Sequence, residues 1–125
     1  GEQDLGGAFS VATSQGANAM FVSNSSLLRA HAERIATLAT QHRMPTVGTP
    51  AFVEKGILLG YGVNLEDIYR RAGGMAAKVL KGAKPADLPI KQPTKFELII
   101  NLKTARALGM TVPHALVARA DRVID

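Results

Sequence analysis

Short runs of strand length alternate with helical stretches along most of this chain, and this alternation constrains the fold more than any other feature. The runs occur at residues 19–22, 45–48, 57–61, 96–100 and 122–124. Apolar runs without polar alternation are typical of strands that are buried on both faces, as in parallel sheets. Because helical segments lie between several of these runs, the pattern predicts βαβ units and a mostly parallel sheet.

The segments between the strands carry helical spacing and helix-start residues. The clearest helix is predicted over residues 27–42, where apolar positions recur at intervals of three and four. A second long helix is predicted over residues 65–81, with Asn64 as its N-cap. Its expected buried face consists of Leu65, Ile68, Ala72, Met75 and Val79. Shorter helical pieces are predicted at residues 5–14, 51–55, 102–108 and 114–120, and a loop with two prolines at residues 84–89. Thr49 as N-cap and Pro50 at the first helical position would start the second of these pieces, and Asn101 would cap the third.

Size and charge describe an ordinary globular domain. The 125 residues are 46% hydrophobic and 20% charged, which suits one domain with an aliphatic core. The net charge of +5 raises the question of nucleic-acid binding. However, the basic residues are scattered, and Arg70 and Arg71 follow Glu66 and Asp67 at the helical spacing that favours ion pairs. A solvated surface, without a nucleic-acid partner, is therefore the expected role of these charges.

Helix-start residues follow three of the predicted strands, at residues 23–26, 48–50 and 61–64. The carboxyl ends of parallel strands meet at one edge of a sheet, so we expect these junctions to lie together. Helix N-termini there present free N–H groups and a partial positive charge, which suit an anionic group such as a carboxylate. Ser, Thr and Asn side chains add neutral hydrogen-bonding groups, and Tyr61 adds a stacking face. The same residue types also cap helices in any α/β domain, so a purely structural role stays open for each.

The chain carries few of the groups that catalysis or metal binding requires. His31 and His42 are eleven residues apart and His114 stands alone, so the histidines have no metal-site spacing. Cys is absent, and so are the GxSxG, GxGxxG and GxxxxGK[ST] motifs. We find no pair of acids placed for general acid–base work. The sequence therefore predicts a binding protein without catalytic residues, metal or cofactor.

Stretches near the C-terminal end carry a family resemblance. Residues 80–89 read LKGAKPADLP, and residues 92–109 read QPTKFELIINLKTARALG. Together with YGVN at residues 61–64 and the ending at residues 112–124, they resemble the C-terminal signature of ABC-transporter substrate-binding proteins of the tryptophan/tyrosine type. The likeness covers nearly the whole chain.

The resemblance implies an architecture. Members of this group are similar to type I periplasmic binding proteins, in which two α/β lobes close on a small molecule. It implies that residues 1–125 form one three-layer α/β lobe with a mostly parallel sheet. This lobe would be the C-terminal portion of a much longer protein, whose first lobe and export signal lie outside this sequence. Residues 92–125 are expected either to pack on this lobe or to cross to the other one.

The resemblance also implies partners, a location and site residues. The protein would bind a small molecule, an amino acid or related carboxylate, and deliver it to an ABC permease in the membrane. It would lie in the periplasm or be lipid-anchored outside the cytoplasmic membrane. The fragment alone would bare the surface that meets the other lobe and is expected to form a homodimer. The expected ligand-binding residues, from the strand ends above and from the family's cleft loops, are Asn24, Ser25, Ser26, Thr49, Phe52, Tyr61 and Asn64.

Other function classes stay open beside the solute-binding interpretation. The effector-sensing lobe of a transcription regulator shares the same fold, and a fragment of an α/β enzyme would show the same alternation of strands and helices. Neighbouring permease and ATPase genes would favour the importer, and a DNA-binding domain preceding the lobe would favour the regulator.

Overall fold

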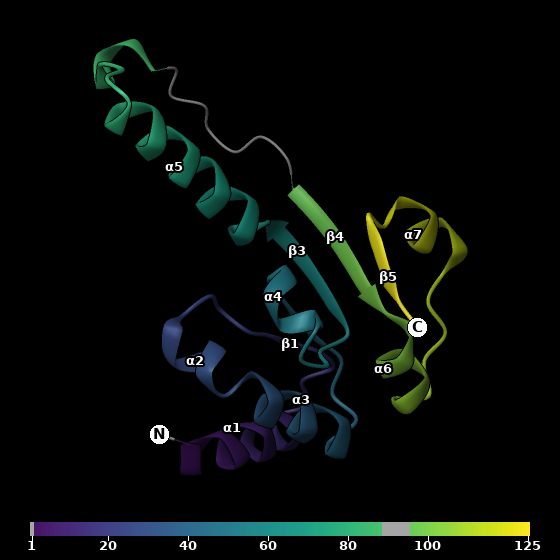
Figure 1. Cartoon of the computed structure of the whole chain (residues 1–125). Coiled ribbons are helices and arrows are strands. Elements are labelled where there is room, and N and C mark those ends of the chain that lie inside the picture. Colours follow the sequence, from purple (N-terminus) through teal and green to yellow (C-terminus); the bar gives the residue numbers. More distant parts are fainter. Residues whose placement is uncertain (1, 89–95) are drawn as a thin grey trace.

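The computed structural model describes residues 2–88 and 96–125, and it shows one five-stranded sheet with helices around it (Figure 1). The strands β1 to β3 are mutually parallel, β4 is antiparallel to β3, and β5 is parallel to β4. Their spatial order follows the sequence. The predicted mostly parallel α/β sheet is therefore confirmed. The strands are β1 (Met20–Phe21), β2 (Thr46–Gly48), β3 (Leu59–Val63), β4 (Phe96–Asn101) and β5 (Arg122–Ile124).

The helices follow the predicted order along the chain. They are α1 (Glu2–Ser14), α2 (Ser26–Ala30), α3 (Ala32–Gln41), α4 (Pro50–Val53), α5 (Leu65–Leu80), α6 (Leu102–Ala107) and α7 (His114–Arg119). The predicted loop at 84–89 contains the 3₁₀ turn η1 (Pro85–Asp87), while its Pro89 lies outside the described residues. Residues 92–95 of the predicted segment 92–125 also lie outside them. Among the helices that the structure describes, none is both long and apolar enough to cross a bilayer.

One expected helix is divided in two. The sequence predicts a single helix over residues 27–42, but α2 and α3 are separated at His31, whose backbone is not helical (φ −109°, ψ 21°). The His31 N–H donates to a carbonyl oxygen three residues earlier at 3.1 Å, so α2 ends in a tight turn. The predicted buried face is nevertheless found on α3, where Ala32, Ile35 and Ala39 are buried.

The hydrophobic core joins helices to the α4 side of the sheet. Phe52 and Ile57 are completely buried, and Phe9 of α1 is 2% exposed. Burial of a side chain of this size stabilises the fold by about 1.5–3 kcal/mol, so these side chains hold α1 and α4 in place. The other members of the buried cluster are Val22, Ala32, Ile35, Ala36, Leu38, Ala39, Met44, Val53 and Ile99.

A single buried amide ties the end of β4 to two helices. Asn101, 5% exposed, accepts a hydrogen bond from the Thr104 N–H at 2.9 Å and caps α6, as predicted. Its Nδ2 donates to the Val53 carbonyl at the end of α4, at 3.3 Å. These two bonds fix the end of α4 and the start of α6 relative to β4.

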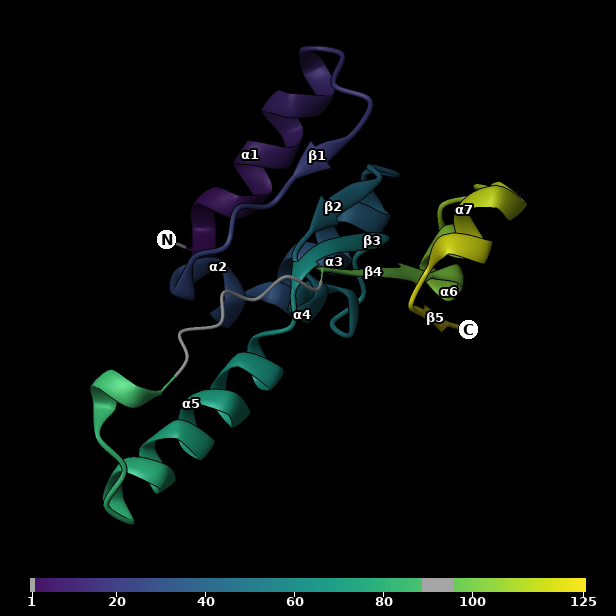
Figure 2. The same ribbon diagram turned by 90° about the horizontal axis from the view of Figure 1, so that it is seen from above.

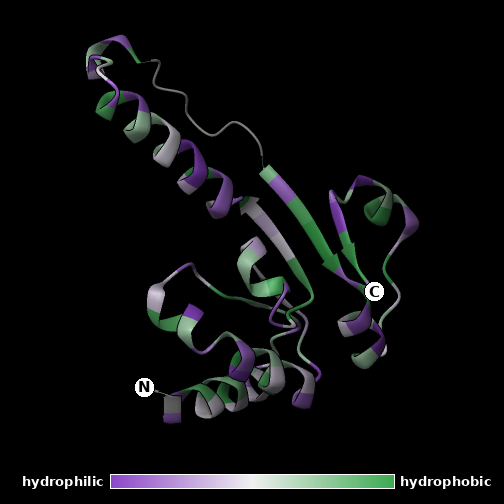
Figure 3. Ribbon diagram, in the orientation of Figure 1, coloured by the Kyte–Doolittle hydropathy of each residue, from purple (hydrophilic) through white to green (hydrophobic). Residues whose placement is uncertain are grey.

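The helix α5 projects away from the sheet in both views (Figures 1 and 2). The prediction of a buried face on this helix is wrong for four of its five residues, because Ala72, Met75 and Val79 are exposed and Ile68 is only half-buried. The side chain of the fifth, Leu65, lies outside the described part of the structure. Apolar spacing shows that a helix has a face to cover, but not which element covers it. We call Ile68, Ala72, Met75 and Val79 the α5 stripe. Figure 3 shows hydrophilic colouring at the end of this helix nearest the sheet and hydrophobic colouring toward its far end.

Candidate functional site

The strand directions bring five segments to one edge of the sheet, which we call the site edge. Since β1, β2 and β3 are parallel, their carboxyl ends lie at this edge, as predicted for the three strand-to-helix junctions. The antiparallel strand β4 begins there, with Glu97 paired to Gly62. The start of β5 follows, with Arg122 paired to Ile99. Glu97, Ile99, Gly62 and Arg122 therefore share one face of the sheet.

The short helix α4 lies directly against the backbone of β3. A Cβ atom placed on Gly60 would be 2.5 Å from Val53 Cγ2, 2.8 Å from the Thr49 carbonyl oxygen and 3.0 Å from Pro50 Cα. These distances are shorter than van der Waals contact, so only glycine allows this close packing. The absence of a side chain at Gly60 thus brings Thr49 and the start of α4 to the site edge.

Thr49 is held at this edge, and its hydroxyl makes no hydrogen bond to the part of the chain that the structure describes. It occupies the N-cap position of α4 in extended conformation (φ −83°, ψ 163°), with Pro50 at the first helical position, as predicted. Its side chain nevertheless makes no capping bond. The buried Thr49 Oγ1 has no hydrogen-bond partner among the described residues. A buried polar group left unpaired costs about 1–3 kcal/mol, so a polar atom of a ligand beside it would be bound favourably.

A cavity of about 380 Å³ opens at the site edge, and we call it the edge cavity. The ends of β1, β2 and β3 contribute to its lining, together with the starts of α4, α5, β4 and β5. Its size lies in the range of sites for small molecules. The lining residues are Asn24, Thr49, Pro50, Ala51, Glu54, Val63, Asn64, Glu66, Ile68, Glu97, Ile99 and Arg122.

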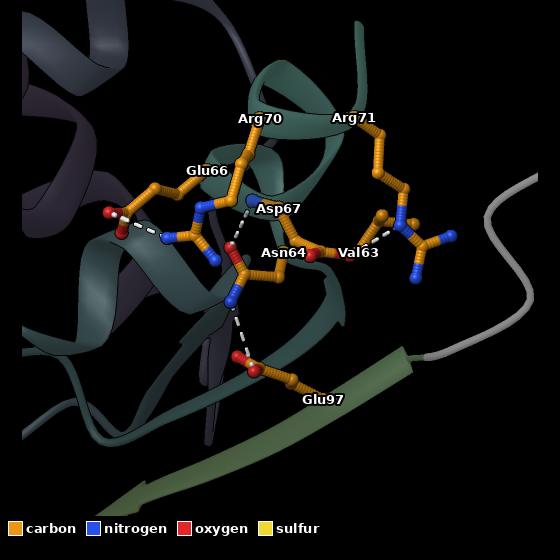
Figure 4. A pocket seen from close by; sticks show the side chains of 7 residues that line it. All are labelled: Val63, Asn64, Glu66, Asp67, Arg70, Arg71 and Glu97. Atoms are coloured by element: carbon orange, nitrogen blue, oxygen red, sulfur yellow. Dashed lines mark hydrogen bonds and ion pairs between the residues drawn. The ribbon is translucent and has the colours of Figure 1, made fainter. Parts of the chain in front are cut away.

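A smaller cavity of about 230 Å³ adjoins the edge cavity at the start of α5 (Figure 4). Asn64 is the N-cap of α5, as predicted, and its Oδ1 accepts from the Asp67 N–H at 3.1 Å. The Asn64 Nδ2 donates to Glu97 Oε1 at 3.0 Å, which links α5 to β4 across the sheet (Figure 4). Asn64 thus orients the Glu97 carboxylate, and both side chains line both cavities.

Carboxylates dominate the charge of the two cavities. Arg122 donates to Glu54 Oε1 at 2.6 Å, and this hydrogen bond raises the pKa of Arg122 above its ordinary value. Partial burial opposes the shift, while the negative charges of Glu54, Glu97 and Glu66 add to it. The guanidinium therefore lies in a negative field that extends beyond its own ion pair.

Three of the predicted site residues, Asn24, Thr49 and Asn64, line the edge cavity. They come from three different junctions, and the parallel strands bring them together. Ser25 instead caps α2, accepting from the Leu28 N–H at 3.1 Å, and Ser26 is the exposed first residue of that helix. Neither serine lines the edge cavity, although both lie in the same junction as Asn24.

The two aromatic predictions fall outside the edge cavity. Phe52 is completely buried in the core, because it lies on the inner side of α4. Tyr61 is 59% exposed and stacks on Phe96, with ring centroids 5.6 Å apart. Since Gly60 and Gly62 face α4, Tyr61 points to the opposite face of the sheet. The structure thus places Phe52 in the core and Tyr61 on the surface across the sheet.

Sequence reasoning missed Glu97 and Arg122. The sequence predicts a mostly parallel sheet, but it does not identify the strand at residues 96–100 as the antiparallel one. The structure reverses β4, and this reversal brings both residues to the site edge. The helix α5 projects away from the sheet and does not pack on it as the helix of a βαβ unit does, and this arrangement accompanies the antiparallel pairing of β3 and β4.

The sequence matches the family described as "ABC transporter substrate binding protein" over residues 2–124. This chain belongs to that family. Among curated proteins it is 27% identical over 92 residues to a tyrosine-binding protein from Clostridioides difficile (strain R20291). That alignment covers 73% of this chain and 27% of the relative, so the chain spans only part of the relative's length.

Solved structures share the fold of this chain. A protein from Streptococcus pneumonia, described as an ABC domain in complex with L-Trp, is 28% identical with a TM-score of 0.81. The match covers 98% of this chain and 42% of that one. A conserved domain protein from Vibrio cholerae O1 biovar eltor is 24% identical with a TM-score of 0.80. That match covers 98% of this chain and 41% of the Vibrio protein. At that identity the second likeness shows the fold alone.

Proposed function

We propose that this chain is the ligand-binding lobe of an ABC importer's solute receptor and that it binds an aromatic amino acid at the site edge. The observation that carries the proposal is the edge cavity, which is lined by Thr49, Asn64 and Glu97 in a member of this family; the Thr49 hydroxyl has no hydrogen-bond partner within the described ranges. Relatives described as tyrosine-binding and as complexed with L-Trp support the ligand class. The site residues proposed are Asn24, Thr49 and Asn64, with Glu97.

A second lobe completes the site in this proposal. The chain covers 41–42% of the two solved relatives described above, which leaves room for another lobe of similar size. The α5 stripe supports this arrangement, because an exposed apolar face of this kind marks a contact surface. We infer that the α5 stripe packs on the other lobe and that the ligand lies between the two.

The rest of the importer follows from the family. The closed receptor delivers its ligand to a membrane permease, and the receptor works in the periplasm or anchored by lipid outside the cytoplasmic membrane. The match to a family of substrate-binding proteins and the likeness to a tyrosine-binding protein favour binding over catalysis. A transcription regulator with the same lobe would instead be identified by a DNA-binding domain and by salt-dependent binding to duplex DNA.

The proposal is tested by identifying what the intact protein carries. Denaturing the purified protein should release its ligand, and we expect mass spectrometry to identify a small molecule with an ammonium and a carboxylate group. Calorimetry should then show one site per protein for L-tryptophan or L-tyrosine, with L-lysine as the control that does not bind. Absence of binding by both aromatic amino acids would contradict the proposed ligand class.

A further inference from the structure

Within residues 2–88 and 96–125, the cavities at the site edge hold one carboxylate that makes no direct ion pair with a protein cation. Glu54 is paired with Arg122 at 2.6 Å, and Asp67 with Arg71 at 3.1 Å. The carboxylate of Glu66 lies 3.6 Å from the Arg70 guanidinium. Glu97 accepts a hydrogen bond from the neutral amide of Asn64, and Arg122 acts on it only through the longer-range attraction that adds to the raised pKa of Arg122.

We propose that Glu97 is the residue that recognises the ammonium group of the ligand, so that this lobe selects small molecules carrying a primary ammonium. This inference rests on the proposed function and names the ligand group that a residue of the edge cavity recognises. A carboxylate offers about four lone-pair positions, and the Asn64 amide occupies one of them. An ammonium group has three N–H donors and no acceptor, which complements the remaining positions.

The position of Glu97 suits this role. The side chain is half-buried and lines both cavities, so a bound ligand would exclude water from it. A charge-assisted hydrogen bond is roughly twice as strong as a neutral one, and partial burial increases the difference. Asn64 holds the carboxylate from one side (Figure 4), so little side-chain freedom is lost when the ligand binds.

A purely structural role is the competing explanation, and one substitution separates the two. In Glu97→Gln the side-chain oxygen still accepts from Asn64 Nδ2, while the negative charge is lost. The link between α5 and β4 would therefore survive. If Glu97 serves only to hold Asn64, the substitution changes neither folding nor ligand affinity.

The experiment compares amino acids with analogues that lack the ammonium group. L-tryptophan, L-tyrosine, indolepropionate and hydroxyphenylpropionate are titrated into the intact protein that carries this chain and into its Glu97→Gln variant. We expect the variant to bind the amino acids about 10- to 100-fold more weakly. Its affinity for the desamino analogues should stay within about threefold of the original. The matched control is Glu33→Gln, which removes the same charge at an exposed ion pair with Lys55 and should change neither affinity.

The outcomes separate this inference from the proposed function. Unchanged amino-acid affinity in Glu97→Gln would overturn the ammonium role while leaving the proposed function intact. Equal weakening of amino acids and desamino analogues would also overturn it, because the loss would then reflect the shape of the site. An unaltered protein that binds neither amino acid would overturn both.

Discussion

The proposed two-lobe receptor predicts that the 125-residue chain alone binds L-tryptophan or L-tyrosine about 10- to 2,000-fold more weakly than the intact protein. Small-molecule sites commonly bury about 70–90% of the ligand surface, and one lobe offers only an open shelf. If the other lobe supplies about half of roughly six hydrogen bonds, at about 0.5–1.5 kcal/mol each, the loss is about 1.5–4.5 kcal/mol. Calorimetry on both proteins measures the ratio directly.

The same fragment is expected to self-associate, because the α5 stripe is exposed without the other lobe. Light scattering on the fragment should give twice the mass of one chain, and the intact protein serves as the control that remains monomeric.

A fragment that binds its ligand as tightly as the intact protein would show that the whole site lies within these 125 residues. The two-lobe account would then be wrong.

Replacing Gly60 with alanine will destabilise the fold by about 2–3 kcal/mol. The new Cβ would lie 2.8 Å from the Thr49 carbonyl oxygen and 3.0 Å from Pro50 Cα, and these are backbone atoms that cannot move aside as a side chain can. The helix α4 must therefore shift away from β3, and Thr49 moves with it. We expect a lower midpoint in urea unfolding and weaker ligand binding by the intact protein.

The matched control for this substitution is Gly7→Ala in α1. Nothing lies within 4 Å of a Cβ atom at Gly7, and its φ is not positive. Alanine there should stabilise the helix by about 0.5–1 kcal/mol, because glycine is the weaker helix former. If Gly60→Ala unfolded at the same urea concentration as the unaltered protein, α4 would not be packed on β3 as described.

The order of the elements could be predicted from local chemistry, because caps and apolar runs act over a few residues. Asn64 and Asn101 both cap the helices that the sequence assigned to them. Boundaries were less certain: the third strand was expected at residues 57–61 and lies at Leu59–Val63. No glycine or proline marks the break at His31, so nothing in the spacing indicated it.

The sequence predicts those residues of the candidate site that directly follow parallel strands, but not those on the antiparallel strand β4. Asn24 and Thr49 follow strands whose direction was correctly inferred, and they line the edge cavity. The position of Glu97 at the site edge depends on the antiparallel direction of β4, which is set by tertiary packing and has no local sequence signal. Phe52 was assigned to the site from the family's loops, but one turn of helix directs it into the core.

A crystal structure of the intact protein with its ligand tests the central claim most directly. The account predicts that the ligand occupies the edge cavity, with its ammonium group on Glu97 and an acceptor about 3 Å from Thr49 Oγ1. The orphan hydroxyl of Thr49 would then have its hydrogen-bond partner in the ligand. A ligand bound elsewhere, with only water at Thr49 and Glu97, would contradict the assignment of the site edge as the binding site.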